Sequence, residues 1–478
     1  MIAPAPLPGA LPAAPGARLP DDFAVRLDPR VRRRDRGTVL LGGSPLRLLR
    51  LSPRAVPLLA GDRLVVRDAP TAALAARLLD AGLAHPDLAP ATGAAGVTVV
   101  VPVKDRPAEL ARLLAALRAD PLTADLPLVV VDDGSAAPVR ADGAVVLRHP
   151  TARGPAAARN AGLRAAGTPV VAFLDSDCVP RPGWLGALLA HLDDPRLALV
   201  APRITALPGA GPLHAYERVA SALDMGPRPA PVQPLTAVSY VPSAALLCRR
   251  AALGPAGGFD EAMRVAEDVD LVWRLAAAGW RVRYDPAAEV AHEHPAGTAD
   301  WLRRRAFYGT GAALLAARHG DVVSPLVVAP DVAAAALLAV GGGRPGRLAA
   351  LGLLAARAVR LSRRLARPGE RPPLGLAAVL TARATGVGTR TMARSVTRHH
   401  WPPAVAAAVL SRRARKVVAA VALADGVLAW WPHRAEVGPV RHVVGRRLDD
   451  LAYGTGLWAG ALRARSARAL LPVRPPAG

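Results

Sequence analysis

Three short, valine-rich runs constrain the fold of this chain more than any other feature of its sequence. The runs VTVVVPV (97–103), LVVVDDGS (128–135) and VVAFLDSD (170–177) begin as uninterrupted apolar stretches, which is typical of strands buried on both faces of a sheet. The segments between them, ELARLLAALRA (109–119) and AAARNAGLRAAG (156–167), have helical spacing. Strands that alternate with helices in this way predict an α/β domain with a parallel sheet and right-handed crossovers.

Acidic and polar residues stand where each of these strands ends. The first strand ends in Pro102-Val103-Lys104-Asp105, the second in Asp132-Asp133-Gly134-Ser135 and the third in Asp175-Ser176-Asp177. Ligands of open parallel sheets bind at this edge. Two carboxylates one residue apart, Asp175 and Asp177, can share a hard divalent cation with a diphosphate. If these two aspartates stood alone, a simple turn would explain them best. The two neighbouring strand ends are also polar, which favours a ligand site.

No glycine-rich phosphate motif accompanies these strands. Neither G-x-x-x-x-G-K-[ST] nor G-x-G-x-x-G occurs at a strand end, so a P-loop and a dinucleotide fingerprint are not expected. A nucleotide would instead be held by Asp132 or Asp133 at its base or ribose and by the segment 154–162. Arg159 in that segment suits the diphosphate or the base, and a solvated helix face explains it equally well.

A second acidic cluster lies further along the chain, in GGFDEAMRVAEDVDLVWRLAAAGW (257–280). Its apolar spacing places Glu267 and Asp268 in the first turn of a helix, where carboxylates favour the helix dipole. The alternative is that a carboxylate beside a bound metal ion and a substrate acts as a general base. Downstream, His292 and His294 lie on one face of a strand-like run, as a metal ligand and its neighbour or as a polar edge.

Composition limits the class of protein. The 478 residues are 52% hydrophobic and 21% charged, which excludes a mini-protein, a collagen-like repeat and a wholly disordered chain. The net charge is +24, and 59 of the 61 basic residues are arginines. Most of this charge lies in residues 301–478, which hold 28 basic and 7 acidic residues. Two cysteines make no disulfide framework and fit a reducing, cytoplasmic setting. We find no secretory signal and no window apolar enough to span a membrane.

Punctuation by proline and glycine predicts four segments. Residues 1–20 are rich in proline and alanine and are expected to be disordered. In 21–90, two strands and two short helices are expected, one helix starting at Ser52 and ending at Gly61 and one running from about Thr71 to Gly82. This pattern suggests a winged-helix-like module. The α/β domain follows over 97–300, and 301–478 is expected to be helical and basic.

The ordered set of motifs resembles the inverting glycosyltransferases of family 2, which have the Rossmann-like GT-A fold. VVVPVKDR, VVVDDGS, GPAAARNAGLRAAGTPVVAFLDSD and the 257–295 segment carry the resemblance. It implies that Asp175 and Asp177 bind Mg²⁺ or Mn²⁺, with His292 or His294 nearby, and that Asp268, beside Glu267, is the base. The implied contacts to a UDP-sugar are Pro102, Lys104, Asp132, Asp133, Arg159, Asp175 and Ser176. The Q/R-x-x-R-W element of processive synthases is absent, which argues against long-chain synthesis.

The module before this domain resembles the PqqD-like domains that capture precursor peptides, through VLLGGSPLRLLRLSPRAVPLLAG and ARLLDAGL. The three-part arrangement resembles the glycosyltransferases of the mycofactocin system. It implies transfer of β-linked glucose to a peptide-derived redox cofactor, with a precursor peptide bound by residues 21–90.

Other readings of the sequence differ in acceptor or in class. Arginine-flanked apolar helices such as 347–364 and 412–431 allow peripheral contact with anionic lipid, and hence a lipid or cell-envelope polysaccharide acceptor at the membrane surface. A nucleotidyltransferase would need glycines in VPVKDRP. A winged-helix nucleic-acid binder would need a more basic first hundred residues and more aromatic residues in the basic third, so no nucleic-acid partner is expected.

Overall fold

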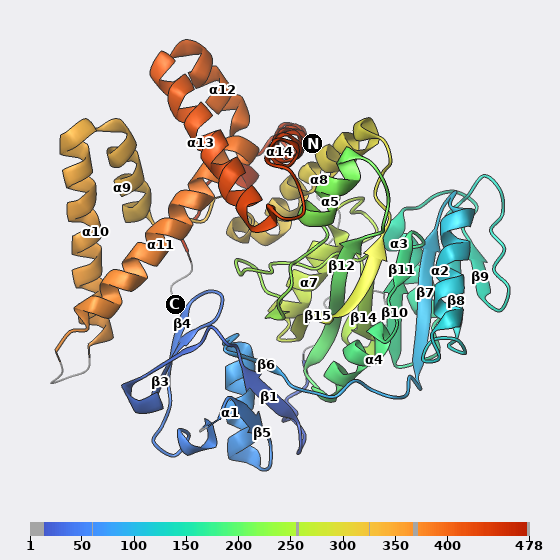
Figure 1. Cartoon of the computed structure of the whole chain (residues 1–478). Helices are drawn as coiled ribbons and strands as arrows, with labels where there is room; N and C mark the ends of the chain where they lie inside the picture. The colour runs from blue at the N-terminus through green and yellow to red at the C-terminus, as the bar shows by residue number, and fades with distance from the viewer. Residues whose placement is uncertain (1–13, 60, 255–257, 325, 367–370, 476–478) are drawn as a thin grey trace. The chain divides into compact units, whose positions relative to one another are not determined.

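The computed structural model describes residues 14–59, 61–254, 258–324, 326–366 and 371–475. The chain divides into two compact units, the first ending at His294 and the second beginning at Pro295 (Figure 1).

A mixed nine-stranded sheet forms the centre of the first unit, in the order β11-β15-β12-β14-β10-β7-β8-β9, with β13 paired to β15. The strands are β7 (Val97–Val103), β8 (Leu128–Asp132), β9 (Val145–Arg148), β10 (Val170–Leu174), β11 (Cys178–Pro180), β12 (Leu197–Ala206), β13 (Ala230–Pro231), β14 (Ala245–Arg249) and β15 (Arg281–His292). β10, β7, β8 and β9 are parallel, as the sequence predicts. β14 runs antiparallel to both of its neighbours.

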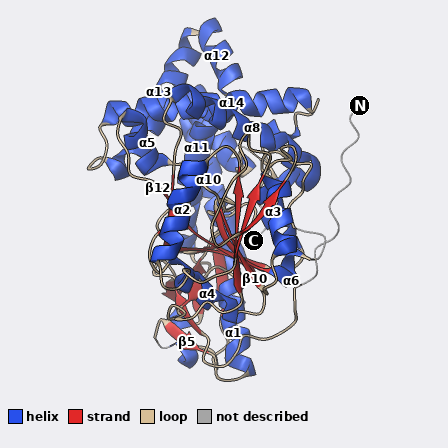
Figure 2. Ribbon diagram, turned by 90° about the vertical axis from the view of Figure 1, so that its right-hand side faces the viewer, coloured by secondary structure: helices blue, strands red, loops and turns tan. Residues whose placement is uncertain are grey.

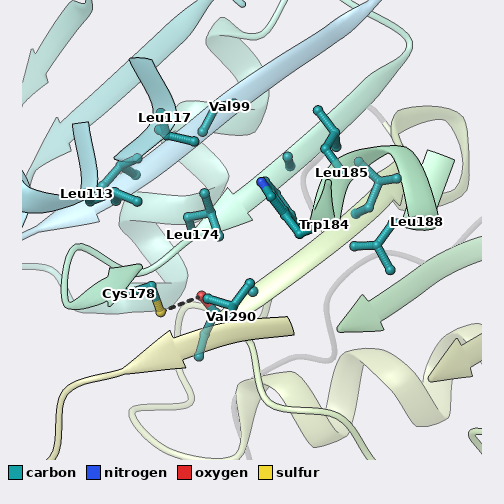
Figure 3. Close-up of a cluster of buried hydrophobic side chains, with 14 of the residues drawn as sticks. Val99, Leu113, Leu117, Leu174, Cys178, Trp184, Leu185, Leu188 and Val290 are labelled. Carbon is teal, nitrogen blue, oxygen red and sulfur yellow. Dashed lines mark hydrogen bonds between the residues drawn. The ribbon is translucent and has the colours of Figure 1, made fainter. Parts of the chain in front are cut away.

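Helices cover both faces of this sheet (Figure 2). They are α2 (Pro107–Ala119), α3 (Pro155–Ala165), α4 (Trp184–Leu189), α5 (Pro212–Ala220), α6 (Arg250–Leu253) and α7 (Glu267–Ala277). Leu113 and Leu117 of α2 share a core with Val99 and with Trp184 of α4 (Figure 3). On the opposite face, a Cβ at Gly162 of α3 would lie 2.2 Å from Val100, so only glycine allows α3 to approach β7 this closely.

Two small sheets and one helix build the module that precedes this domain. The sheets have the orders β5-β1-β6 and β2-β3-β4, and the strands are β1 (Ala24–Leu27), β2 (Arg32–Arg34), β3 (Val39–Gly42), β4 (Arg47–Arg50), β5 (Arg63–Val65) and β6 (Ala84–Pro86). The predicted second helix is α1 (Ala69–Asp80), and Asp68 and Thr71 form its capping box.

The predicted helix from Ser52 to Gly61 is wrong. Residues 53–56 form turns and Pro57–Leu59 a single 3₁₀ turn. Pro57 lacks the N–H that an α-helix would direct to the carbonyl of Pro53, and its ring crowds that carbonyl. Of the segment predicted to be disordered, residues 1–13 lie outside the described residues. Leu19 is buried in the module's core, so the predicted disorder does not extend to it.

The second unit is helical among its described residues, in agreement with the sequence. Its α-helices are α8 (Thr298–His319), α9 (Pro330–Gly341), α10 (Gly343–Leu365), α11 (Leu374–Arg394), α12 (Trp401–Leu410), α13 (Arg412–Trp430) and α14 (Pro439–Arg463). α8 and α14 pack closely at glycines, since a Cβ at Gly456 would lie 1.7 Å from the carbonyl oxygen of Ala306. In the part of the chain that the structure describes, no helix is both long and apolar enough to cross a membrane.

Candidate active site

The carboxyl ends of β7, β8 and β10 meet the first turn of α7 and the end of β15 at one edge of the sheet. Asp175 follows β10, and Asp177 immediately precedes β11. Because β11 pairs with β15 with Cys178 opposite His292, strand pairing brings His292 beside Asp177. The sheet topology therefore gathers residues that are more than a hundred positions apart in the chain.

Arg159 joins the two predicted acidic clusters. From α3 it donates one hydrogen bond of 2.6 Å to Asp175 and another of 3.1 Å to Glu267. Its side chain is 3% exposed and lies 5.6 Å from the centre of the Phe259 ring. Burial alone would lower the pKa of Arg159, but the carboxylates of Asp175 and Glu267 raise it above the ordinary value. A solvated position for Arg159 is thereby ruled out.

The Glu267–Asp268 pair begins α7, as predicted, but more than the helix dipole acts on it. Burial raises the pKa of Glu267 to about 7, with the charge of Asp268 adding to the shift and Arg159 opposing it. Burial also raises the pKa of Asp268, whereas hydrogen bonds from the backbone N–H groups of Ser243 (3.1 Å) and Val269 (2.8 Å) lower it. A carboxylate with a raised pKa is a better proton acceptor once ionised.

The residue before this pair holds a strained backbone. Ala266 has φ 63° and ψ 21°, the left-handed region in which an L-residue other than glycine is disfavoured. The tight turn lets the chain enter α7 so that Glu267 and Asp268 both lie in its first turn.

Asp177 lies between two basic side chains. One carboxylate oxygen pairs with Arg106, and the other lies 3.4 Å from Nε2 of His292. Nδ1 of His292 is buried and has no hydrogen-bond partner among the described residues. His294 instead faces Glu217, with 3.0 Å between Nδ1 and the carboxylate, although the two imidazole centres are only 5.7 Å apart. His292, rather than His294, therefore shares a site with Asp177.

The two aspartates at the end of β8 accept hydrogen bonds from the loops around them. Asp132 accepts hydrogen bonds from the backbone of Ser135 (2.9 Å) and Val139 (3.2 Å), and from Arg148. Asp133 accepts from the backbone of Gly154 (2.8 Å) and Arg153 (2.9 Å), and it pairs with His149. Burial alone would raise both pKa values, but these hydrogen bonds lower them. The two aspartates thus shape the edge of the site, and direct contact between them and a nucleotide stays a prediction.

The remaining predicted residues lie along the same edge. Pro102 is half-buried in β7, Lys104 is exposed just beyond it, and Ser176 is buried between the two aspartates. Sequence reasoning missed Arg106 and Asn160. Arg106 directly follows the first strand end, so the strand-end rule alone was sufficient to find it.

Asn160 connects α3 to the segment before α7. Its amide donates to the carbonyl of Phe259 (2.9 Å) and accepts from the N–H of Phe259 (3.1 Å). Nothing in the sequence marks this contact, which spans 99 positions.

Among the described residues, the histidine, cysteine, aspartate and glutamate side chains that could bind a metal ion lie together only in groups of fewer than three. Of the residues predicted to bind a cation, Asp177 and His292 lie beside each other, whereas Asp175 is held by Arg159. A cation bound by them stays a prediction.

Comparisons with known proteins identify the family of the chain. The model of glycosyl transferase family 2 matches residues 98–252. Pre-mycofactocin glycosyltransferases of two Mycobacterium tuberculosis strains, CDC 1551 / Oshkosh and ATCC 25618 / H37Rv, are each 49% identical over 473 residues, which are 95% of this chain and 98% of theirs. An N-acetylglucosaminyl-diphospho-decaprenol L-rhamnosyltransferase of M. tuberculosis is 41% identical over 85 residues, 17% of this chain and 28% of its own.

Among solved structures, the mannosyltransferase PcManGT from Pyrobaculum calidifontis in complex with GDP-Man and Mn²⁺ is 21% identical, covers 63% of this chain and 89% of its own, and has a TM-score of 0.37. The predicted α/β fold of the GT-A type is confirmed by the sheet described above and by the family match. The chain belongs to the family-2 glycosyltransferases and, within them, to the family of the pre-mycofactocin glycosyltransferases.

Proposed function

We propose that this glycosyltransferase moves a hexose, glucose in β linkage, from a UDP-sugar to pre-mycofactocin, a peptide-derived precursor of a redox cofactor. The match to relatives named for that acceptor supports the choice, because it runs through almost the whole of both chains, including the module and the helical unit. The reaction takes place in the cytoplasm on this proposal, in keeping with two buried, free cysteines.

One observation carries the assignment of the site. Arg159 binds Asp175 and Glu267 at once, so the residues proposed for the donor diphosphate and the residues proposed for proton removal share one buried guanidinium. A donor bound at Asp175 therefore presents its sugar beside the first turn of α7.

The side chains of Asp175, Asp177 and His292 offer ligand atoms that suit Mg²⁺ or Mn²⁺. Adjacent ligands of an octahedral ion of this size are about 3 Å apart, and Asp177 and Nε2 of His292 are separated by 3.4 Å. Such ions take few protein ligands and complete their shell with phosphate oxygens and water, which agrees with a site of two or three protein groups. Asp175, Asp177 and His292 would hold the ion, and it would stabilise the charge that develops on the leaving diphosphate.

Asp268 is the proposed base. Its carboxylate takes the proton of an acceptor hydroxyl while that oxygen forms a bond to the anomeric carbon. The bond between that carbon and the diphosphate breaks, and its electron pair leaves with UDP. Attack and departure occur on opposite faces, so the configuration inverts. Arg159 remains beside Glu267 and keeps the two neighbouring carboxylates from repelling each other without compensation.

The donor pocket is completed by residues at the strand ends. Pro102, Lys104, Asp132, Asp133 and Ser176 line this edge on our proposal, with Lys104 and Arg106 supplying positive charge toward the diphosphate. Arg106 now pairs with Asp177 and is free to exchange that carboxylate for a phosphate oxygen when cation and donor arrive.

The N-terminal module is proposed to hold the peptide part of the acceptor or its precursor. Charged contacts join it to the transferase domain: Arg281 of β15 binds Asp80 of α1 at 2.8 Å and is itself held by Asp194 of the transferase domain at 2.9 Å. Arg283 donates to Nδ1 of His85 at 3.0 Å. A module held at this many points keeps its peptide at a constant position relative to the site.

A panel of nucleotide sugars, each incubated with pre-mycofactocin and analysed by mass spectrometry, tests the function. We expect a hexose to be added from UDP-glucose by the native chain and none by Asp268→Asn. Product from another donor would change the sugar, and absence of product with every donor, while a lipid-linked acceptor is glycosylated, would overturn the acceptor.

A further inference from the structure

Exposed apolar side chains are concentrated in the second unit. Of the 28 large hydrophobic residues that are exposed among the described residues, 24 lie in or after α8. Single exposed apolar residues are ordinary on a protein surface, but gathered patches mark interaction sites.

Two helical hairpins, α9–α10 and α12–α13, can be followed in Figure 1, and the clearest of these patches lie at their ends. The first tip, residues 337–351, joins α9 to α10 and exposes Leu337, Leu348 and Leu351 by 65–69%. The second tip, residues 405–416, joins α12 to α13 and exposes Val409 by 72% and Leu410 by 86%. α12 contains no charged residue and buries none of its described side chains.

Arg413 brings the two tips together. Its guanidinium, at the start of α13, donates to the carbonyl of Gly341 at the end of α9 at 2.6 Å. The apolar ends of both hairpins therefore lie next to each other and form one surface within this unit, hereafter the hairpin-tip surface (337–351 and 405–416).

Positive charge surrounds the hairpin-tip surface. Arg344, Arg347, Arg412, Arg415 and Lys416 are exposed. None of the five has an ion-pair partner among the residues that the structure describes. Over residues 332–424 the chain has 16 arginines and lysines against one acidic residue, Glu370.

The nearby acids are neutralised away from the tips. Asp331, at the opposite end of α9, pairs with Arg357 and Arg360 of α10. Asp425 lies about 14 Å along α13 from its first turn and binds Arg446 (2.9 Å) and Arg447 (2.5 Å) of α14. The two acids are thus paired away from the tips, whereas the five exposed basic residues at the tips have no ion-pair partner among the described residues.

We propose that the hairpin-tip surface docks on anionic lipid, with the apolar side chains entering the headgroup boundary and the surrounding arginines contacting lipid phosphates. Exposed apolar groups flanked by unpaired basic residues are what an anionic membrane interface attracts. A second protein copy is a poorer occupant, because two such surfaces would bring like charges together.

Flotation of the full chain with phosphatidylcholine vesicles, with and without phosphatidylglycerol, tests this. We expect binding only to the anionic vesicles, and weaker binding as salt is raised. The variant Arg412→Gln/Arg415→Gln/Lys416→Gln is expected to bind about a hundredfold more weakly. Val409→Ser/Leu410→Ser is expected to lose about tenfold or more.

Matched controls use the first unit. Arg32→Gln/Arg34→Gln/Arg47→Gln removes three exposed charges, and Val145→Ser/Val146→Ser removes two exposed apolar side chains; neither set is expected to change vesicle binding. Circular dichroism establishes that each variant is folded. The proposal would be overturned by equal binding to neutral and anionic vesicles, or by an equal loss of binding in the tip variants and the control variants. It would also be overturned if the chain bound no vesicles and instead formed a dimer that the tip variants dissociate.

Discussion

The guanidinium of Arg159 lies 2.6 Å from the carboxylate of Asp175, and this contact joins α3 to the carboxyl end of β10. The buried arginine also binds Glu267, so a change of charge at one carboxylate alters the electrostatic surroundings of the other. The candidate site is therefore one coupled electrostatic unit, and the first predictions concern its members.

Asp268→Asn is expected to lower the rate of transfer by about a thousandfold or more, because asparagine cannot accept the acceptor's proton. The amide still fits beside the backbone N–H of Ser243, so UDP affinity should stay near the native value. Product formation followed by mass spectrometry and UDP titration by calorimetry give the two readings. Near-native turnover in this variant would remove Asp268 as the base.

Arg159→Met is expected to destabilise the chain by about 3–5 kcal/mol, since it leaves Asp175 and Glu267 without their shared positive partner. Arg159→Lys keeps the charge but cannot reach both carboxylates in a fork, and should fall between. Thermal unfolding measures the loss. The control Arg164→Met, on the exposed side of the same helix, should cost little, and equal costs at the two positions would contradict a central role for Arg159.

His292→Ala and Asp177→Ala are each expected to weaken the Mn²⁺-dependent part of UDP binding by about tenfold or more. His294→Ala provides the matched control, because that imidazole faces Glu217 instead of Asp177. Calorimetric titration of UDP with and without Mn²⁺ separates the variants. If His294→Ala lost metal-dependent binding and His292→Ala kept it, the ligand assignment would be reversed.

The rate of transfer should fall in acid at a higher pH than an ordinary aspartate would produce. Asp268 must be ionised to act as base, and its pKa is raised mainly by burial, so kcat/KM decreases as pH falls through that raised value. Glu267→Gln removes a neighbouring negative charge and should move the acid limb to lower pH. Profiles of kcat/KM against pH for both chains decide this, and an unmoved limb would show the two carboxyls to be independent.

Acid should loosen the module through His85. Burial is the main reason that its pKa lies at about 4 rather than 6.5, with Arg283 lowering it further and Asp28 opposing the shift. Between these values the unfolded chain binds the extra proton, so stability falls as pH drops from 6.5 toward 4, by about 3 kcal/mol. Thermal unfolding of the native chain and of His85→Gln at pH 7 and 4.5 should show a smaller drop in the variant.

Local pattern was enough to locate much of the fold. The valine runs predict β7, β8 and β10 because strands buried on both faces need apolar residues at every position. The first turn of α7 is predicted by the spacing of Leu271 and Leu275. The strand-end rule places Asp132, Asp133, Asp175 and Asp177 at one edge without any coordinates.

The sequence pattern did not predict the shortest strands of the module or the turns around its prolines. The strands β1, β2, β5 and β6 are three or four residues long, too short to show a period. β1 pairs with β5 and β6, which lie far along the chain, so no local pattern predicts that sheet. The predicted helix after Ser52 failed because two prolines four positions apart fit a sequence of turns better than an α-helix.

Periodicity and residue type along the chain are enough to predict the fold class, the family and the acids that end the strands. Which partner each of these acids has depends on the folded structure. It directs Asp132 and Asp133 into their own loops, joins Asp175 to Glu267 through Arg159, and selects His292 over His294. Hydrogen bonds and ion pairs form between atoms a few ångströms apart, and helix packing and strand register, rather than spacing along the sequence, set those distances.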